Sequence, residues 1–129
     1  MRNLTVIQPA LVLVHSPLVG PLTWEPAAER LQSAGRVVVV PSLAGVMDGE
    51  PPYYRRLAAR VAGEVVGACA GSRVVLAGHS GAGALLPAIA AEIAACGNAA
   101  DVAVHCAIFV DAILPHPGQT WFETAPTAG

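Results

Sequence analysis

Aliphatic residues occur along the chain in short unbroken runs that alternate with amphipathic stretches. The runs at 11–14 and 37–40 contain only leucine and valine. Such runs are typical of strands in a parallel sheet covered on both faces, because side chains pointing in either direction are then buried. Between the runs, apolar residues return at helical spacing with charged residues among them. The pattern predicts alternating strands and helices.

Glycine, proline and the phase of the apolar positions set the limits of these elements. The predicted strands are Ala10–His15, Arg36–Val40, Arg73–Ala77 (breaking at Gly78) and Val102–Val110. The predicted helices cover about Trp24–Ala34, an apolar stripe from Leu57 to about Cys69, and a stripe from Leu85 to about Cys96. Arg55, Arg56, Arg60 and Glu64 are predicted to face solvent. This alternation implies a parallel α/β sheet with right-handed crossovers and helices on both faces, a three-layer architecture.

The composition fits one domain with an unusually apolar surface. The 129 residues are enough for a single core, and we expect one domain over 1–129. Hydrophobic residues make up 54% and charged residues 12%, about half the usual charged share. We therefore expect apolar surface that a second copy or a complementing chain would bury.

Charge and cysteine content exclude several partners. The net charge is −2 and all seven basic residues are scattered arginines, which argues against nucleic acid. The three cysteines form no Cys-x-x-Cys pair, so we expect reduced thiols and a cytoplasmic protein. No signal-peptide layout and no stretch of about 20 apolar residues is present, so we expect no membrane partner.

One segment has the pattern of a nucleophile elbow. An aliphatic strand leads into Gly78-His79-Ser80-Gly81-Ala82, and a helical stripe follows. The elbow requires small residues on both sides of the serine, because the turn is sharp and the serine backbone is strained. Here Gly78 and Ala82 take those positions, with alanine where glycine is usual. The Gly81 N–H, at the positive end of the following helix, is the predicted oxyanion donor.

This segment resembles the nucleophile-bearing, N-terminal half of the α/β-hydrolase superfamily, in particular its small esterase-like members. The resemblance implies a second oxyanion donor in the turn after the first strand, which here reads His15-Ser16-Pro17-Leu18. Pro17 has no N–H, so the Leu18 N–H or the Ser16 hydroxyl would have to replace it. In open α/β sheets, ligands bind beyond the carboxyl ends of the strands. With a strand order 2-1-3-4, His15-Ser16 and His79-Ser80 would meet at that edge.

An acid and a base are needed beside the serine. Asp111 directly follows the fourth predicted strand, where some family members carry the acid; an aspartate that only caps a loop is the equal alternative. The family places its histidine later in the chain. We interpret His15 as structural, His79 as an elbow packing residue, His105 as a strand residue and His116 as a solvent-exposed loop residue, with a swing of His116 toward the site as the alternative. No catalytic histidine is identified, and 115–129 is expected to be loop in a chain that lacks the C-terminal part of the fold.

Other chemistries lack their residues. The glycine spacing fits no dinucleotide fingerprint, no P-loop lysine exists, and no histidines or cysteines fall at metal-ligand spacing, so we expect no cofactor and no metal. The first hypothesis is a carboxylesterase-like or thioesterase-like hydrolase acting on a small-molecule ester through an acyl-serine. The second is an inactive hydrolase-like protein that binds a small apolar ligand or a protein. The third is a shortened gene product without an independent role.

Overall fold

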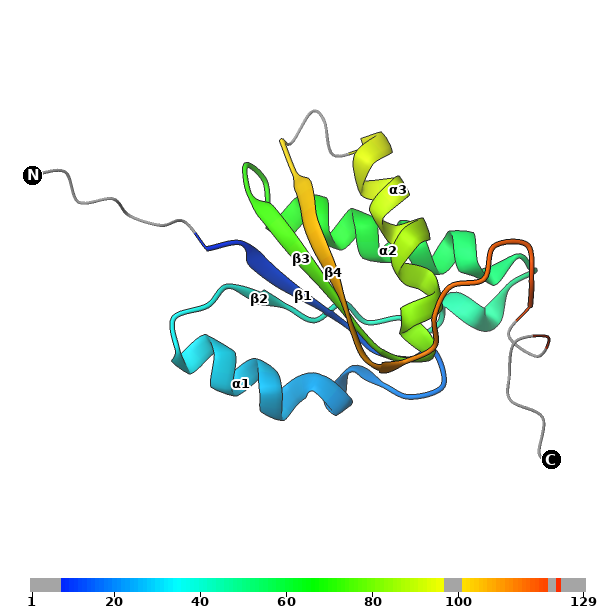
Figure 1. Cartoon of the computed structure of the whole chain (residues 1–129), viewed down its shortest axis with the longest axis horizontal. Coiled ribbons are helices and arrows are strands. Elements are labelled where there is room, and N and C mark those ends of the chain that lie inside the picture. The colour runs from blue at the N-terminus through cyan, green and yellow to red at the C-terminus, as the bar shows by residue number, and fades with distance from the viewer. Residues whose placement is uncertain (1–7, 97–100, 121–122, 124–129) are drawn as a thin grey trace, which may run out of the picture.

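The computed structural model describes residues 8–96, 101–120 and 123. Within them a sheet of four parallel strands, connected through helices, confirms the predicted α/β class, and its strand order is β2-β1-β3-β4 (Figure 1). The strands are β1 Ala10–Val14, β2 Val38–Val39, β3 Arg73–Ser80 and β4 Ala103–Ala112. The α-helices are α1 Glu25–Ser33, α2 Tyr53–Ala68 and α3 Leu86–Cys96. Short 3₁₀ turns lie at Pro21–Trp24, Val46–Asp48 and Gly81–Leu85.

The predicted limits of all four strands differ from the structure, by a single residue for β1, which ends at Val14 and not at His15. The second strand is only two residues long, since it pairs with β1 at Val38 and Val39 alone. The third strand does not break at Gly78 but continues to Ser80, because β4 pairs with it over that whole length. The fourth strand likewise runs on to Ala112, so that Asp111 lies inside it. In each case pairing with a neighbour, which local sequence does not specify, sets the end.

The described residues form two core clusters, which draw on alternate residues of the central strands. Val12, Val14 and Leu76 belong to the larger cluster, together with the apolar stripes of α2 and α3. Leu13 and Ala77 belong to the smaller one, with Ala28 of α1. Successive side chains of a strand point in opposite directions, which explains the division. In Figure 1, α2 and α3 lie side by side, whereas α1 lies beside β1 and β2.

Arg56 departs from its prediction. The side chain is half-buried, and its guanidinium donates a hydrogen bond to the Val46 carbonyl. It thereby ties α2 to the loop before it, rather than facing solvent as Arg55, Arg60 and Glu64 do. An amphipathic pattern assigns a side chain to the polar face of its own helix but carries no information about a loop that folds over that face.

The cysteines share no common environment. Cys69 is buried in the larger cluster, whereas Cys96 and Cys106 are exposed, and all three are free thiols. Only Cys69 is therefore packed as a small apolar side chain of the core. Among the residues described, none of the helices has the length and apolar character needed to cross a membrane.

Residues 113–120 form neither helix nor strand, and the segment expected to be loop begins within them, at Pro115. Apart from position 123, the remainder of the predicted loop lies outside the described residues.

Candidate active site

Ser80 sits at the junction of β3 and the 3₁₀ turn Gly81–Leu85 in a strained conformation. Its backbone has φ 54° and ψ −124°, outside the regions that residues with a side chain ordinarily adopt. Strain of this kind persists only where the surrounding structure enforces it, and it is concentrated at functional sites. The strained turn expected at this serine is therefore present.

Glycines on both sides of Ser80 allow three segments to converge. A methyl group built on Gly81 would lie 3.0 Å from the Ser16 Oγ, and one on Gly78 would lie 3.0 Å from the Leu86 side chain. One on Gly83 would lie only 2.2 Å from the Ile113 carbonyl oxygen. Gly83 thus lets the chain after β4 approach the turn. Its place three residues after the serine is the one local feature of the sequence that marks this glycine.

The loop after β1 is fixed by His15. This residue is only 2% exposed, and both ring nitrogens bond to the backbone. Its Nε2 accepts a hydrogen bond from the Leu43 N–H at 3.0 Å. A neutral imidazole that accepts at one nitrogen donates at the other, so Nδ1–H donates to the Ser16 carbonyl oxygen at 2.8 Å. The structural role expected for His15 is observed.

Ser16 and Leu18 occupy the predicted second half of the oxyanion hole. The Leu18 N–H donates to the Ser16 Oγ at 3.3 Å. This backbone donor is therefore already engaged, and Pro17 has none. The Ser16 hydroxyl proton remains as the donor of this loop, in a side chain that is 3% exposed and lies against Gly81.

The ring of His79 packs against Trp24. Its ring meets that of Trp24 edge to face, with 6.1 Å between centroids. The Trp24 indole N–H donates to the Val14 carbonyl at 2.9 Å, which fixes the aromatic ring beside the end of β1. The buried Nδ1 of His79 makes no hydrogen bond to any residue described. The packing role predicted for this residue agrees with these contacts.

Asp111 lies beside Ser80 in the sheet. It was predicted to follow the fourth strand, but it is a residue of that strand. The register passes from His79 opposite Val110 to Ser80 opposite Ala112, so Asp111 is the extra residue of a bulge. It has φ 43° and is exposed. Beyond it, the Ile113 N–H donates to the Ser80 carbonyl at 3.0 Å. Bulges of this kind re-aim side chains and are frequent beside active sites.

The two remaining histidines, His105 and His116, make no hydrogen bond with Ser80. His105 is exposed and contacts the Arg73 guanidinium at the amino end of β3, whereas Ser80 is at the carboxyl end of that strand. His116 is exposed on the segment after β4 and lines a cavity. In the part of the chain that the structure describes, no histidine makes a hydrogen bond with the Ser80 hydroxyl.

A cavity of about 790 Å³ opens between the start of α2, the turn after Ser80 and the segment 113–120. Aliphatic, proline and tyrosine side chains form most of its lining, with His116, Gln119 and Thr120 among the polar residues. Leu85 of the wall belongs to the turn that begins directly after Ser80. The volume lies within the range of small-molecule sites.

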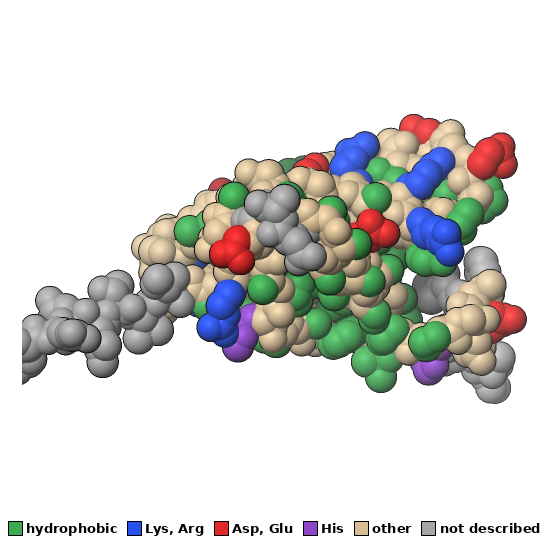
Figure 2. Space-filling view, turned by 90° about the horizontal axis from the view of Figure 1, so that it is seen from above, with side chains coloured by type: hydrophobic (Ala, Val, Ile, Leu, Met, Phe, Trp, Pro, Cys, Tyr) green, Lys and Arg blue, Asp and Glu red, His purple; other side chains and the backbone are tan. Residues whose placement is uncertain are grey.

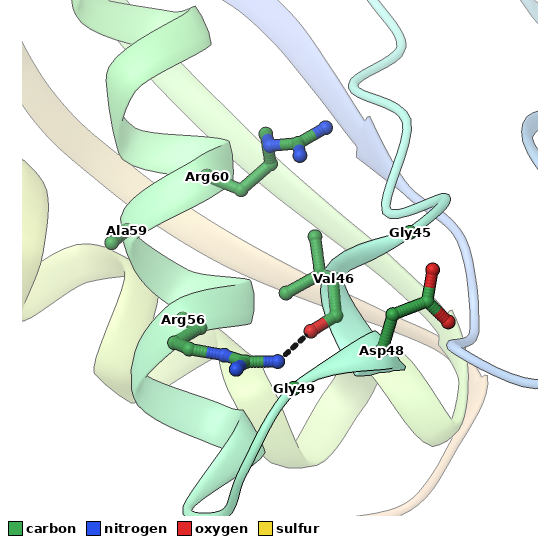
Figure 3. A pocket seen from close by; sticks show the side chains of 7 residues that line it. All are labelled: Gly45, Val46, Asp48, Gly49, Arg56, Ala59 and Arg60. Carbon is green, nitrogen blue, oxygen red and sulfur yellow. Dashed lines mark hydrogen bonds between the residues drawn. The ribbon is translucent and has the colours of Figure 1, made fainter.

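A second cavity, of about 650 Å³, lies between α2 and the loop of residues 45–49 (Figure 3). Arg56 and Arg60 both line it, but Arg56 turns toward the Val46 carbonyl and Arg60 points away from it. Asp48 adds a carboxylate at its margin. These charges do not converge on a common point, so the cavity has no arrangement for holding an anion.

Among the described residues, no group of three His, Cys, Asp or Glu side chains is arranged to hold a metal ion. Comparison with models of protein families and with curated proteins finds no match for this sequence.

Proposed function

We propose that this chain is a serine hydrolase of the α/β-hydrolase fold, with a three-layer arrangement of helices about its sheet, that cleaves acyl esters through an acyl-serine. The observation that carries the proposal is the strained backbone of Ser80 between a strand and a helical turn, with φ 54° and ψ −124°. A nucleophile on such a turn projects its hydroxyl beyond the carboxyl edge of the sheet. The closely packed glycines around it support the same reading.

The proposed acylation has three participants from the described residues. The Ser80 Oγ attacks the ester carbonyl, and the negative charge that develops on the carbonyl oxygen is stabilised by hydrogen-bond donors. The Gly81 N–H is the first donor, and the Ser16 hydroxyl, which lies against Gly81, is the second. Collapse of the tetrahedral intermediate expels the alcohol and leaves an acyl-serine, which water then hydrolyses.

The attack of Ser80 requires a base that takes up the hydroxyl proton and then returns it to the departing alcohol, and His116 is the candidate. His15 is held by backbone groups on both nitrogens, His79 is packed on Trp24, and His105 is at the far end of the strand. The Ile113 N–H donates a hydrogen bond to the Ser80 carbonyl. Only Leu114 and Pro115 lie between Ile113 and His116, so a short segment of chain separates His116 from Ser80. Asp111, on the adjacent bulge, is the proposed acid.

The test is labelling with a fluorophosphonate, which reacts only with an activated serine. We expect labelling of the wild-type chain that Ser80→Ala abolishes and that Ser33→Ala, a change at an exposed serine on α1, leaves intact. His116→Ala should reduce the labelling rate by about 10² or more, the usual contribution of a general base. A folded wild-type sample that labels no faster than Ser80→Ala would overturn the proposal.

The second candidate is a non-catalytic protein that binds a small apolar ligand. The largely apolar cavity of about 790 Å³, together with the lack of a histidine contact to Ser80 among the described residues, favours it. A long-chain alkyl ketone, which cannot be hydrolysed, should then raise the melting temperature of a chain that does not label. Ala84→Trp, at the cavity wall, should abolish that rise; an equal rise in the variant would contradict this candidate.

A further inference from the structure

The β4 strand is an open edge of the sheet. It is ten residues long, and among the described residues no strand lies beyond it. The opposite edge, β2, has only two residues. A long edge strand presents unpaired N–H and C=O groups that another strand can engage, whereas a very short one does not. The β4 edge therefore has the backbone groups to accept one more strand.

Its side chains do not protect this edge. The strand contains no lysine and no proline, the residues that usually block edge pairing. Ile108, Phe109 and Val110 at its centre are 47%, 38% and 39% exposed. Figure 2 shows hydrophobic side chains gathered at the surface along one margin of the molecule, near a histidine and an arginine. The edge is apolar where a second strand would lie.

The irregularities of β4 are placed symmetrically. Pairing with β3 is regular from Cys106 to Val110, and the extra residues on either side are His105 and Asp111. Both stand three positions from Ile108. If two β4 strands pair antiparallel about a twofold axis at Ile108, the regular stretch Cys106–Val110 of one copy therefore lies opposite the same stretch of the other. In that register Cys106 faces Val110, and His105 faces Asp111.

The charges at the two ends of β4 are complementary in this same register. At one end the Arg73 guanidinium contacts His105, and at the other Asp111 is the single carboxylate of the strand. The twofold axis brings each Asp111 to the Arg73–His105 pair of the other copy. Asp101 precedes the strand and lies outside the overlap. Opposite charges facing one another across strands stabilise a pair, and a shift of the register by two residues in either direction loses them.

We propose that the partner of this edge is a second copy of the chain, bound antiparallel through β4 with its twofold axis at Ile108. The sheet then continues from one copy into the other, and the apolar centre of each β4 is covered. The proposal rests on the edge and its charges, and it does not depend on any reaction at Ser80.

Sedimentation of the full chain over a range of concentrations tests the association. We expect a monomer–dimer equilibrium whose dissociation constant rises by about tenfold or more in Ile108→Lys, because two ammonium groups then oppose each other at the axis. Val37→Lys, at an exposed apolar position beside the β2 edge, is the matched control and should dimerise as the wild type does. Far-UV circular dichroism checks that both variants are folded. A wild-type chain that stays monomeric overturns the proposal, whether or not its β4 edge binds a strand of another protein. An equal loss of dimerisation in Ile108→Lys and Val37→Lys overturns it as well.

Cysteine cross-linking tests the register in a background carrying Cys96→Ser and Cys106→Ser. Ile108→Cys should form an intermolecular disulfide on mild oxidation, since the axis places the two residues directly opposite. Ala107→Cys should not, because its counterpart would be a diagonal neighbour at about 7–8 Å, beyond disulfide reach. Asp111→Asn should weaken the dimer and reduce its sensitivity to salt. Cross-linking through position 107 but not 108, or an unchanged salt response, would contradict the proposed pairing.

Discussion

Ser80 holds a backbone conformation that costs free energy, because its Cβ meets the neighbouring peptide groups at φ 54°. Such strain is worth about 1–3 kcal/mol, and glycine would relieve it. Glycine also adds about 0.5–1 kcal/mol of unfolded-state entropy, which offsets part of that gain. We therefore expect Ser80→Gly to raise the free energy of unfolding by about 1 kcal/mol in urea titrations. Ser80→Ala retains the strain and should not; equal stability of the two variants would contradict this account.

His15 shows how one side chain can fix a loop. Removing it would leave the buried Leu43 N–H without its acceptor, and an unsatisfied buried donor costs about 1–3 kcal/mol, before any cavity is counted. We expect His15→Ala to lower the free energy of unfolding by about 2–4 kcal/mol. The exposed His116→Ala should change it by less than about 0.5 kcal/mol. Denaturant unfolding of both variants provides the comparison, and similar losses would argue against a structural role specific to His15.

At the scale of elements, the glycines on either side of Ser80 determine how closely the neighbouring segments can pack. A methyl group at Gly83 meets the rigid Ile113 carbonyl, whereas one at Gly78 meets only the Leu86 side chain, which can rotate. We expect Gly83→Ala to destabilise the fold by about 1–3 kcal/mol or more and Gly78→Ala by clearly less. Melting temperatures of the two variants test the order. A reversed order would mean that the segment after β4 yields more readily than the α3 side chain.

At the scale of the whole molecule, the thiols report on the fold. Burial raises the pKa of the Cys69 thiol above its ordinary value of 9.0, since the charged form is desolvated. We expect iodoacetamide to modify the exposed Cys96 and Cys106 in the native protein and Cys69 only on unfolding, as read by mass spectrometry. Because the pKa of Cys69 is higher in the folded than in the unfolded chain, burial of its neutral thiol contributes fully to stability at pH values below the unfolded-state pKa. This contribution is lost as the pH rises through the folded-state pKa. Native-state modification of all three at similar rates would contradict this burial.

The local pattern determined the elements and their order. Unbroken aliphatic runs and helical stripes are properties of neighbouring residues, so strands β1 and β3, helices α1 and α2, and the strained turn at Ser80 could be predicted. The topology followed too, because strands that alternate with helices favour a parallel sheet.

Only the tertiary structure decided what depends on residues far apart in the chain. The lengths of β2, β3 and β4 were set by pairing partners, the bulge at Asp111 by the register between two strands, and the burial of Arg56 by a loop that folds over α2. The engagement of both nitrogens of His15 required Leu43, which lies far along the sequence. The sequence by itself therefore determined which chemistry could be present, because a residue type is local. Whether the side chains that carry this chemistry lie close together is decided by contacts between distant segments, which no local pattern contains.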